Sequence, residues 1–142
     1  MEVTASDIAR VPVTNLRVPR AEFGVLWATA ERLCDEQGER GITDWYGAGV
    51  VVTCRWLAGA ATRTATGRAQ PAYSPVTGRL ARAYEELIDA ELMAAEEFLV
   101  RVPAPAVRQN RPGWIEAITA TLHWAWRHAG PPPLDLELRE LG

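Results

Sequence analysis

Prolines and glycines divide this chain into four stretches long enough for helices, and this division constrains the fold more than any other feature. Proline lacks a backbone N–H and its ring clashes inside a helix, so helices are confined to the intervals between such residues. The breaks fall at Pro12 and Pro19, at Gly38, across 61–76, at Pro103 and Pro105, and across 130–133. The pattern predicts a mainly α, single-domain bundle of about four helices covering residues 1–142.

The predicted helices span residues 20–37, 43–60, 77–100 and 112–129. The second is apolar on most sides, which is typical of a helix buried at the centre of a bundle. Its glycines at 47 and 49 would permit close approach of another helix. The β-branched run at 50–53 leaves a buried strand over 50–56 as the alternative. In the first helix a stripe at helical spacing predicts the buried face, namely Phe23, Leu26, Trp27, Ala30, Leu33 and Cys34.

Three segments are expected to lie outside the long helices. Residues 1–19 carry prolines between apolar side chains, which predicts an extended N-terminal arm. Residues 61–76 lack apolar periodicity and are rich in Gly, Pro, Ser and Thr, so we expect a loop. Residues 130–142 form a Pro-rich C-terminal tail.

Cysteine usage and apolar patterning indicate a soluble, cytoplasmic protein. Cys34 and Cys54 have no paired spacing and are expected to be reduced. The N-terminus shows no signal-peptide pattern. The longest apolar stretch, residues 45–61, is interrupted by Arg55 and is too short to span a bilayer. We therefore expect no membrane association.

Every one of the 15 basic residues is Arg, although the net charge is −3. GC-rich codons encode the dominant residue types, so we expect a GC-rich bacterium or its mobile element as the source. The Arg-rich segment 55–82 precedes an acidic run at 85–97. Neutralisation between the two is the simplest interpretation, and contact of Arg63 and Arg68 with nucleic acid or an acidic protein is the alternative.

Glu91 stands out among the acids because it falls on the apolar arc of its helix. A buried carboxylate must be paired, hydrogen-bonded or protonated, since isolated buried charge is costly. We expect its partner to be an Arg, Tyr46, a Trp indole or a His. A structural ion pair is the favoured interpretation, and a functional acid is the alternative.

The last helix places Trp124 on its polar side, close to His123 and Arg127. Trp and Arg are the residue types that dominate interface hot spots, so these three are candidate partner-binding residues. Coverage of Trp124 by the arm or the tail is the alternative. The two histidines, His123 and His128, are five apart and so cannot form the two-His metal motif, which needs a spacing of three or four.

We find no motif for catalytic, cofactor-binding or metal-binding residues, and we expect no cofactor. The sequence thus favours a non-enzymatic interaction protein, an adaptor or assembly subunit with a protein partner or a second copy. One alternative is a helical nucleic-acid-binding protein that uses the 55–82 segment. Another is a small enzyme or a ligand-binding domain built on the Trp-rich core, with Trp45 and Trp56 lining its pocket.

Overall fold

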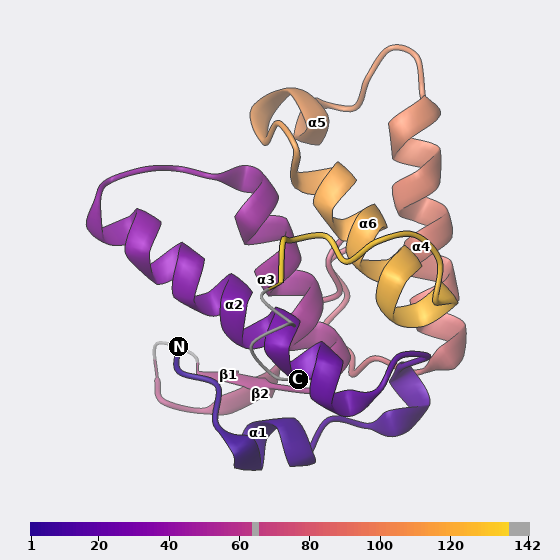
Figure 1. The fold of residues 1–142 in the computed structure, drawn as a ribbon. Helices are drawn as coiled ribbons and strands as arrows, with labels where there is room; N and C mark the ends of the chain where they lie inside the picture. The colour runs from indigo at the N-terminus through magenta and orange to yellow at the C-terminus, as the bar shows by residue number, and fades with distance from the viewer. Residues whose placement is uncertain (64–65, 137–142) are drawn as a thin grey trace.

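The fold is built on four long helices. A computed structural model describes residues 1–63 and 66–136, apart from the side chains of residues 62 and 63. The long helices are α2 (Arg20–Glu39), α3 (Trp45–Ala58), α4 (Glu85–Val100) and α6 (Trp114–Arg127) (Figure 1). The shorter elements are α1 (Ala5–Ala9), the 3-10 helix η1 (Val13–Asn15), the strands β1 (Ala61–Arg63) and β2 (Ala69–Pro71), and α5 (Ala106–Asn110). The fold is mainly helical, as the sequence predicts.

Helix α3 lies in the middle of the bundle, packed between α2 and α6, and α6 packs in turn against α4. This central position explains why α3 is apolar on most sides. Trp56 of α3 is 1% exposed and Leu26 of α2 is fully buried, so the predicted burial of the second helix and of the first helix at Leu26 is confirmed. Residues 50–56 are helical, and the strand alternative is wrong.

A close approach between α3 and α6 depends on Gly49. A Cβ atom at this position would lie 2.7 Å from the Trp114 carbonyl oxygen and 2.8 Å from the Ala117 Cβ. Real Cβ atoms do not approach neighbours so closely, so only glycine permits this helix contact. The role expected for this glycine is therefore confirmed, and the contact fixes the start of α6 against α3.

The N-terminal segment is not the extended arm that its prolines predict. Thr4 caps α1 in a capping box, in which its side chain accepts a hydrogen bond from the Asp7 N–H. Pro12 and Pro19 then precede η1 and α2 as N-cap residues. Proline is excluded from helix interiors but tolerated where a helix begins, so one short helix fits before Pro12 and another between Pro12 and Pro19.

The third predicted helix begins at Glu85 and not at residue 77. Residues 77–84 stay outside the helix because their backbone groups bond elsewhere. The Ala81 carbonyl, which a helix would pair with residue 85, accepts a hydrogen bond from Trp56 Nε1 at 2.9 Å. The Ala83 carbonyl likewise accepts from the buried Asn15 amide at 3.3 Å. We call residues 72–84 the β2–α4 loop.

The remaining connections contain more structure than expected. Strands β1 and β2 pair antiparallel within the predicted 61–76 loop. This hairpin and α1 lie at one end of the bundle, and α5 lies at the opposite end (Figure 1). In the tail, Leu134 and Leu136 pack against the core. Residues 137–142 of the predicted tail fall outside the described part of the chain.

Candidate ligand-binding site

A cavity of about 660 Å³ opens between α3, the β2–α4 loop and the α5–α6 corner. Its charged lining residues are Arg55 and Arg111, and the described lining contains no Asp or Glu. The rest of the wall is mostly apolar, with a few neutral polar groups: Val52, Ala72, Tyr73, Pro75, Val76, Thr77, Gly78, Val107, Asn110 and Trp114. The described lining of the cavity therefore combines two cations with apolar side chains and holds no acidic residue, although the whole chain has a net negative charge.

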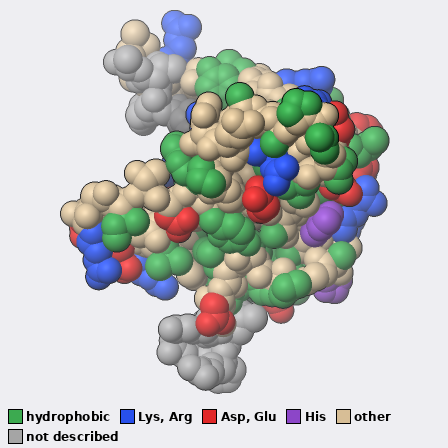
Figure 2. All heavy atoms as spheres, turned by 90° about the horizontal axis from the view of Figure 1, so that it is seen from above, with side chains coloured by type: hydrophobic (Ala, Val, Ile, Leu, Met, Phe, Trp, Pro, Cys, Tyr) green, Lys and Arg blue, Asp and Glu red, His purple; other side chains and the backbone are tan. Residues whose placement is uncertain are grey.

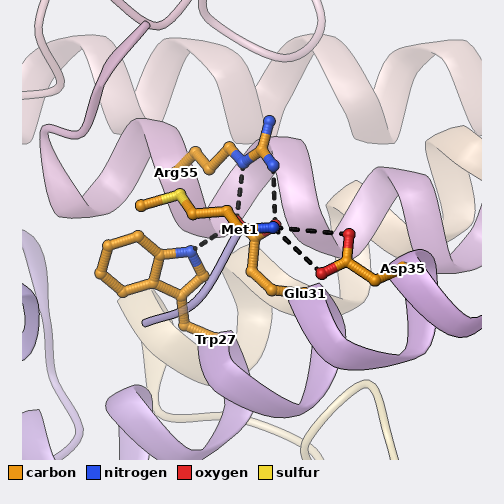
Figure 3. A network of polar contacts seen from close by, with 5 residues as sticks. All are labelled: Met1, Trp27, Glu31, Asp35 and Arg55. Carbon is orange, nitrogen blue, oxygen red and sulfur yellow. Dashed lines mark hydrogen bonds and ion pairs between the residues drawn. The ribbon is translucent and has the colours of Figure 1, made fainter. Parts of the chain in front are cut away.

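Arg55 is held in the wall by Glu31 of α2. Its Nε and Nη2 atoms each donate a hydrogen bond of 2.7 Å to the Glu31 carboxylate, which also accepts from Trp27 Nε1 at 3.0 Å (Figure 3). Glu31 is 1% exposed. The bond to Glu31 raises the pKa of the Arg55 guanidinium against the opposing effect of burial. The pair thus fixes the direction of an arginine that remains partly open to solvent.

The N-terminal ammonium of Met1 joins the same network. It donates hydrogen bonds to the Asp35 carboxylate, the shorter at 3.1 Å, and lies 3.9 Å from the Glu31 Oε1 atom (Figure 3). The Glu31 carboxylate therefore has cations on two sides. Sequence reasoning missed Glu31. Two features of the sequence could have indicated its role. Glu31 lies one helical turn after Trp27, and Arg55 is the one charged residue of the apolar helix α3 and therefore needs an acidic partner.

Arg111 is positioned by aromatic rings and not by a carboxylate. Its guanidinium carbon lies 4.8 Å from the centre of the Trp114 ring and 5.2 Å from that of Trp45. Cation–π contacts of this kind orient the guanidinium without neutralising its charge. In the described part of the chain, no carboxylate forms an ion pair with Arg111. Because Gly49 brings α6 close to α3, the Trp114 ring stands beside the cavity.

Glu91 fixes the opposite wall. Its carboxylate is fully buried and accepts hydrogen bonds from Val76 N at 2.8 Å, Thr77 N at 3.1 Å and Thr77 Oγ1 at 2.6 Å. The predicted burial of Glu91 is confirmed, but the expected partner types are wrong. The partners are the backbone and hydroxyl of a loop, which no helical periodicity reveals.

The tryptophan that lines the cavity is not one of the two that the ligand-pocket alternative names as its lining. Trp56 is buried in the core and binds the β2–α4 loop through its indole N–H. Trp45 contacts Arg111, and Trp114 lines the cavity itself. Trp114 is the tryptophan in the described lining of this cavity, and neither Trp45 nor Trp56 lines it.

Trp124 is not available as the exposed partner-binding residue that the sequence suggests. It is 6% exposed within the isolated chain. Trp124 follows Ala117 by about two helical turns, so both lie on the α6 face that packs on α3. Because α6 packs against α3 as well as α4, its buried arc is wider than the predicted stripe.

The other predicted partner-binding residues stay apart from the cavity. Arg127 Nη2 lies 3.3 Å from Asp89 Oδ1, and His123 Nε2 lies 3.9 Å from Glu96 Oε1. Both therefore face acids of α4. Arg68 is exposed within the hairpin connection, and the side chain of Arg63 lies outside what the structure describes.

One face of the molecule carries charged side chains of both signs (Figure 2). On the face seen in Figure 2, acidic and basic side chains alternate with apolar ones and do not gather by sign. Among the described residues, no three His, Cys, Asp or Glu side chains come together in a way that could hold a metal ion. None of the described helices combines the length and the apolar character needed to cross a membrane.

The arrangement of the cavity suits an organic anion. Two guanidinium groups offer N–H donors, and the ring of Trp114 and several aliphatic side chains offer apolar contact. Comparisons with protein-family models, with curated proteins and with solved structures found no significant match to this chain.

Proposed function

We propose that the protein binds a small amphipathic organic anion in the cavity between α3, the β2–α4 loop and the α5–α6 corner. The observation that carries the proposal is the lining itself. Arg55 and Arg111 face the cavity without any lining acid among the described residues, in a chain of net charge −3. A positively charged, largely apolar concavity attracts an anion and gives it a low-dielectric surface.

The size of the cavity supports a small molecule. Ligand sites generally occupy about 300–1,000 Å³ and combine apolar walls with a few well-placed polar groups. A cavity of about 660 Å³ falls within that range. Its apolar side chains, including Val52, Val76 and Val107, would contact the body of the ligand.

Preorganisation gives the proposal further support. Glu31 fixes Arg55, and Glu91 fixes the loop wall at Val76 and Thr77. Groups that are already ordered lose little conformational freedom when a ligand arrives, so less of the binding free energy is spent on ordering them. Both buried acids support the cavity without facing it.

The test uses 8-anilinonaphthalene-1-sulfonate, an aromatic monoanion whose fluorescence rises in apolar sites. We expect saturable binding at one site per chain, monitored by fluorescence titration. N-phenyl-1-naphthylamine, the uncharged counterpart without the sulfonate, should bind more weakly. Equal affinity for the two probes would show that charge plays no part and would contradict the proposal.

Two variants locate the binding. Arg111→Ala should weaken sulfonate binding at least about tenfold, because a hydrogen bond to a charged group contributes about 1.5–3 kcal/mol. Arg32→Ala removes an exposed arginine from α2 and should leave the affinity unchanged. Circular dichroism of each variant checks that the helical fold is retained. Unchanged affinity in Arg111→Ala would place the probe elsewhere.

A protein–protein interaction is a second candidate, and a different observation favours it. Met93 near the middle of α4, Val100 at its end and Val102 just beyond it are 67%, 76% and 92% exposed. We propose a second copy of the chain as the occupant of this surface. Light scattering should then report a dimer, and Val100→Asp should return it to a monomer. A monomeric wild-type chain at high concentration would contradict this candidate.

Nucleic-acid binding through the 55–82 segment stays a prediction without added support. Arg55, one of the five arginines in that segment, is committed to the buried Glu31. A salt-dependent titration with duplex DNA tests it, because phosphate contacts release counterions and make affinity fall with salt.

A further inference from the structure

We infer that the cavity selects a monoanionic head group, a carboxylate, over a dianionic phosphate. The inference rests on the proposed function and concerns the charge of the ligand that the site accepts. It follows from the different ways in which Arg55 and Arg111 are balanced.

The charge of Arg55 is already compensated inside the protein. Two hydrogen bonds of 2.7 Å join its guanidinium to Glu31, which is 1% exposed. Salt screens a partly buried pair much less than an exposed one, so the opposite charges of Arg55 and Glu31 cancel each other at short range. Arg55 therefore offers a remaining N–H group to a ligand, but the Arg55–Glu31 pair adds no net charge to the cavity.

Among the described lining residues, Arg111 supplies the one positive charge that no carboxylate compensates. Its contacts are the ring faces of Trp45 and Trp114, and no described carboxylate pairs with it. Because the two rings contact the flat face of the guanidinium, its N–H groups, which lie at the edge, can still donate hydrogen bonds to an anion. A carboxylate matches such an edge with two parallel hydrogen bonds in the guanidinium plane.

The loop wall adds no further cation, and the Glu91 carboxylate behind it places a negative charge near the cavity that no described cation pairs. The Thr77 hydroxyl and the backbone N–H groups of Val76 and Thr77 are taken up by Glu91. Apart from the arginines, the described lining offers only neutral groups. A dianion would carry one negative charge without a counterpart into a largely apolar cavity, and an unpaired charge in such a place is costly. A monoanion pairs with Arg111 and brings no second charge.

The experiment compares three ligands with one phenylalkyl body by calorimetric titration at pH 8. These are 4-phenylbutyrate, its neutral amide, and 3-phenylpropyl phosphate. The phosphate ester is a dianion at this pH because its second pKa is about 6. We expect the carboxylate to bind at least about tenfold more tightly than either of the others, a free-energy difference of about 1.4 kcal/mol. A phosphate that binds as tightly as the carboxylate, or more tightly, overturns the inference.

A pH series on the wild-type protein provides a second measurement. Between pH 8 and pH 5.5 the phosphate ester takes up a proton and becomes a monoanion, whereas 4-phenylbutyrate keeps its single charge. Phosphate binding should therefore strengthen relative to carboxylate binding as the pH falls. A ratio that stays constant, or one that moves the other way, contradicts the inference.

Glu31 provides the test within the protein. Glu31→Gln removes the counter-charge of Arg55 and should shift the preference toward the phosphate by about tenfold or more, a change of about 1.4 kcal/mol. The double variant Glu31→Gln with Arg55→Gln restores the charge balance, so the preference for the carboxylate should return. An unchanged preference in a folded Glu31→Gln variant counts against the inference, and the pH series decides if that variant fails to fold. If neither the three ligands nor the aromatic sulfonate bind the wild-type protein, the proposed function itself fails.

Discussion

Arg55 and Glu31 form a bidentate pair that joins the two helices α3 and α2 beside the cavity, with two hydrogen bonds of 2.7 Å. The Glu31 side chain is 2% exposed, whereas the Arg55 side chain is 33% exposed. One end of the pair thus belongs to the core and the other to the cavity. This asymmetry decides what each substitution should do.

Replacement of Arg55 by Leu should destabilise the fold. It leaves the Glu31 carboxylate buried without its main partner, and breaking a buried pair in this way costs about 3–5 kcal/mol. The Trp27 indole and the Met1 ammonium remain near Glu31, so we expect about 3 kcal/mol. Urea denaturation measures the loss, and an unchanged midpoint would contradict it. Arg32→Leu on the exposed side of α2 is the control.

Gly49→Ala should disturb both the fold and the cavity. The added Cβ would lie 2.7 Å from the Trp114 carbonyl oxygen, so α6 must move away from α3. Overpacking of this kind costs about 1–3 kcal/mol. We also expect weaker binding of the aromatic sulfonate, because Trp114 moves with α6.

Gly38→Ala is the matched control for this substitution. Although the sequence predicts a helix break at Gly38, α2 continues to Glu39, and a Cβ at Gly38 meets nothing within 4 Å. Alanine is favoured over glycine in helices by about 0.5–1 kcal/mol, so this variant should be slightly more stable. Thermal melts of the two variants should therefore move in opposite directions. A Gly49→Ala protein that melts at or above the wild-type temperature would show that the helix contact is not tight.

Glu91→Gln should loosen the wall formed by the β2–α4 loop. The carboxylate accepts three hydrogen bonds from Val76 and Thr77, and the substitution replaces one acceptor oxygen by a donor group. Loss of bonds to a charged acceptor costs about 1.5–3 kcal/mol each. Hydrogen exchange at the Val76 and Thr77 amides should accelerate, while Glu86→Gln on the exposed face of α4 should not change it. Equal protection in both variants would mean that Glu91 does not anchor the loop.

Trp124→Ala should lower the stability of the chain itself. The ring is 6% exposed and belongs to the core, and removal of a large buried aromatic side chain costs about 3–5 kcal/mol. Chemical denaturation measures this difference on the isolated protein. If the free energy of unfolding stays unchanged and only self-association weakens, Trp124 serves a partner surface after all.

The two thiols should differ in reactivity. Burial raises the pKa of the Cys54 thiol far above its usual range, with a smaller contribution from the Glu31 charge. Burial also raises the pKa of the partly exposed Cys34, so less of it is thiolate at pH 8 than in a free cysteine. Ellman's reagent should therefore label Cys34 slowly, and faster as pH rises, and reach Cys54 only after unfolding. Rapid labelling of both thiols in the native protein would contradict this.

Prolines, glycines and apolar spacing determined the four long helices, because those signals act within a few residues along the chain. The sequence also showed that Glu91 faces the core and that α3 is the central helix, since helical periodicity reports which side of a helix is apolar. These features follow from local geometry, and no knowledge of the neighbouring element is needed.

Tertiary structure alone decided which groups meet. The late start of α4 follows from hydrogen bonds that Trp56 and Asn15 make with the β2–α4 loop, across long separations in the chain. The burial of Trp124 follows from a second helix packed on α6. The cavity, likewise, exists because Glu31 aims Arg55 from α2, while Gly49 lets α6 bring Trp114 close. Periodicity identifies the face that a side chain occupies, but the partner of that face is set by packing between distant segments.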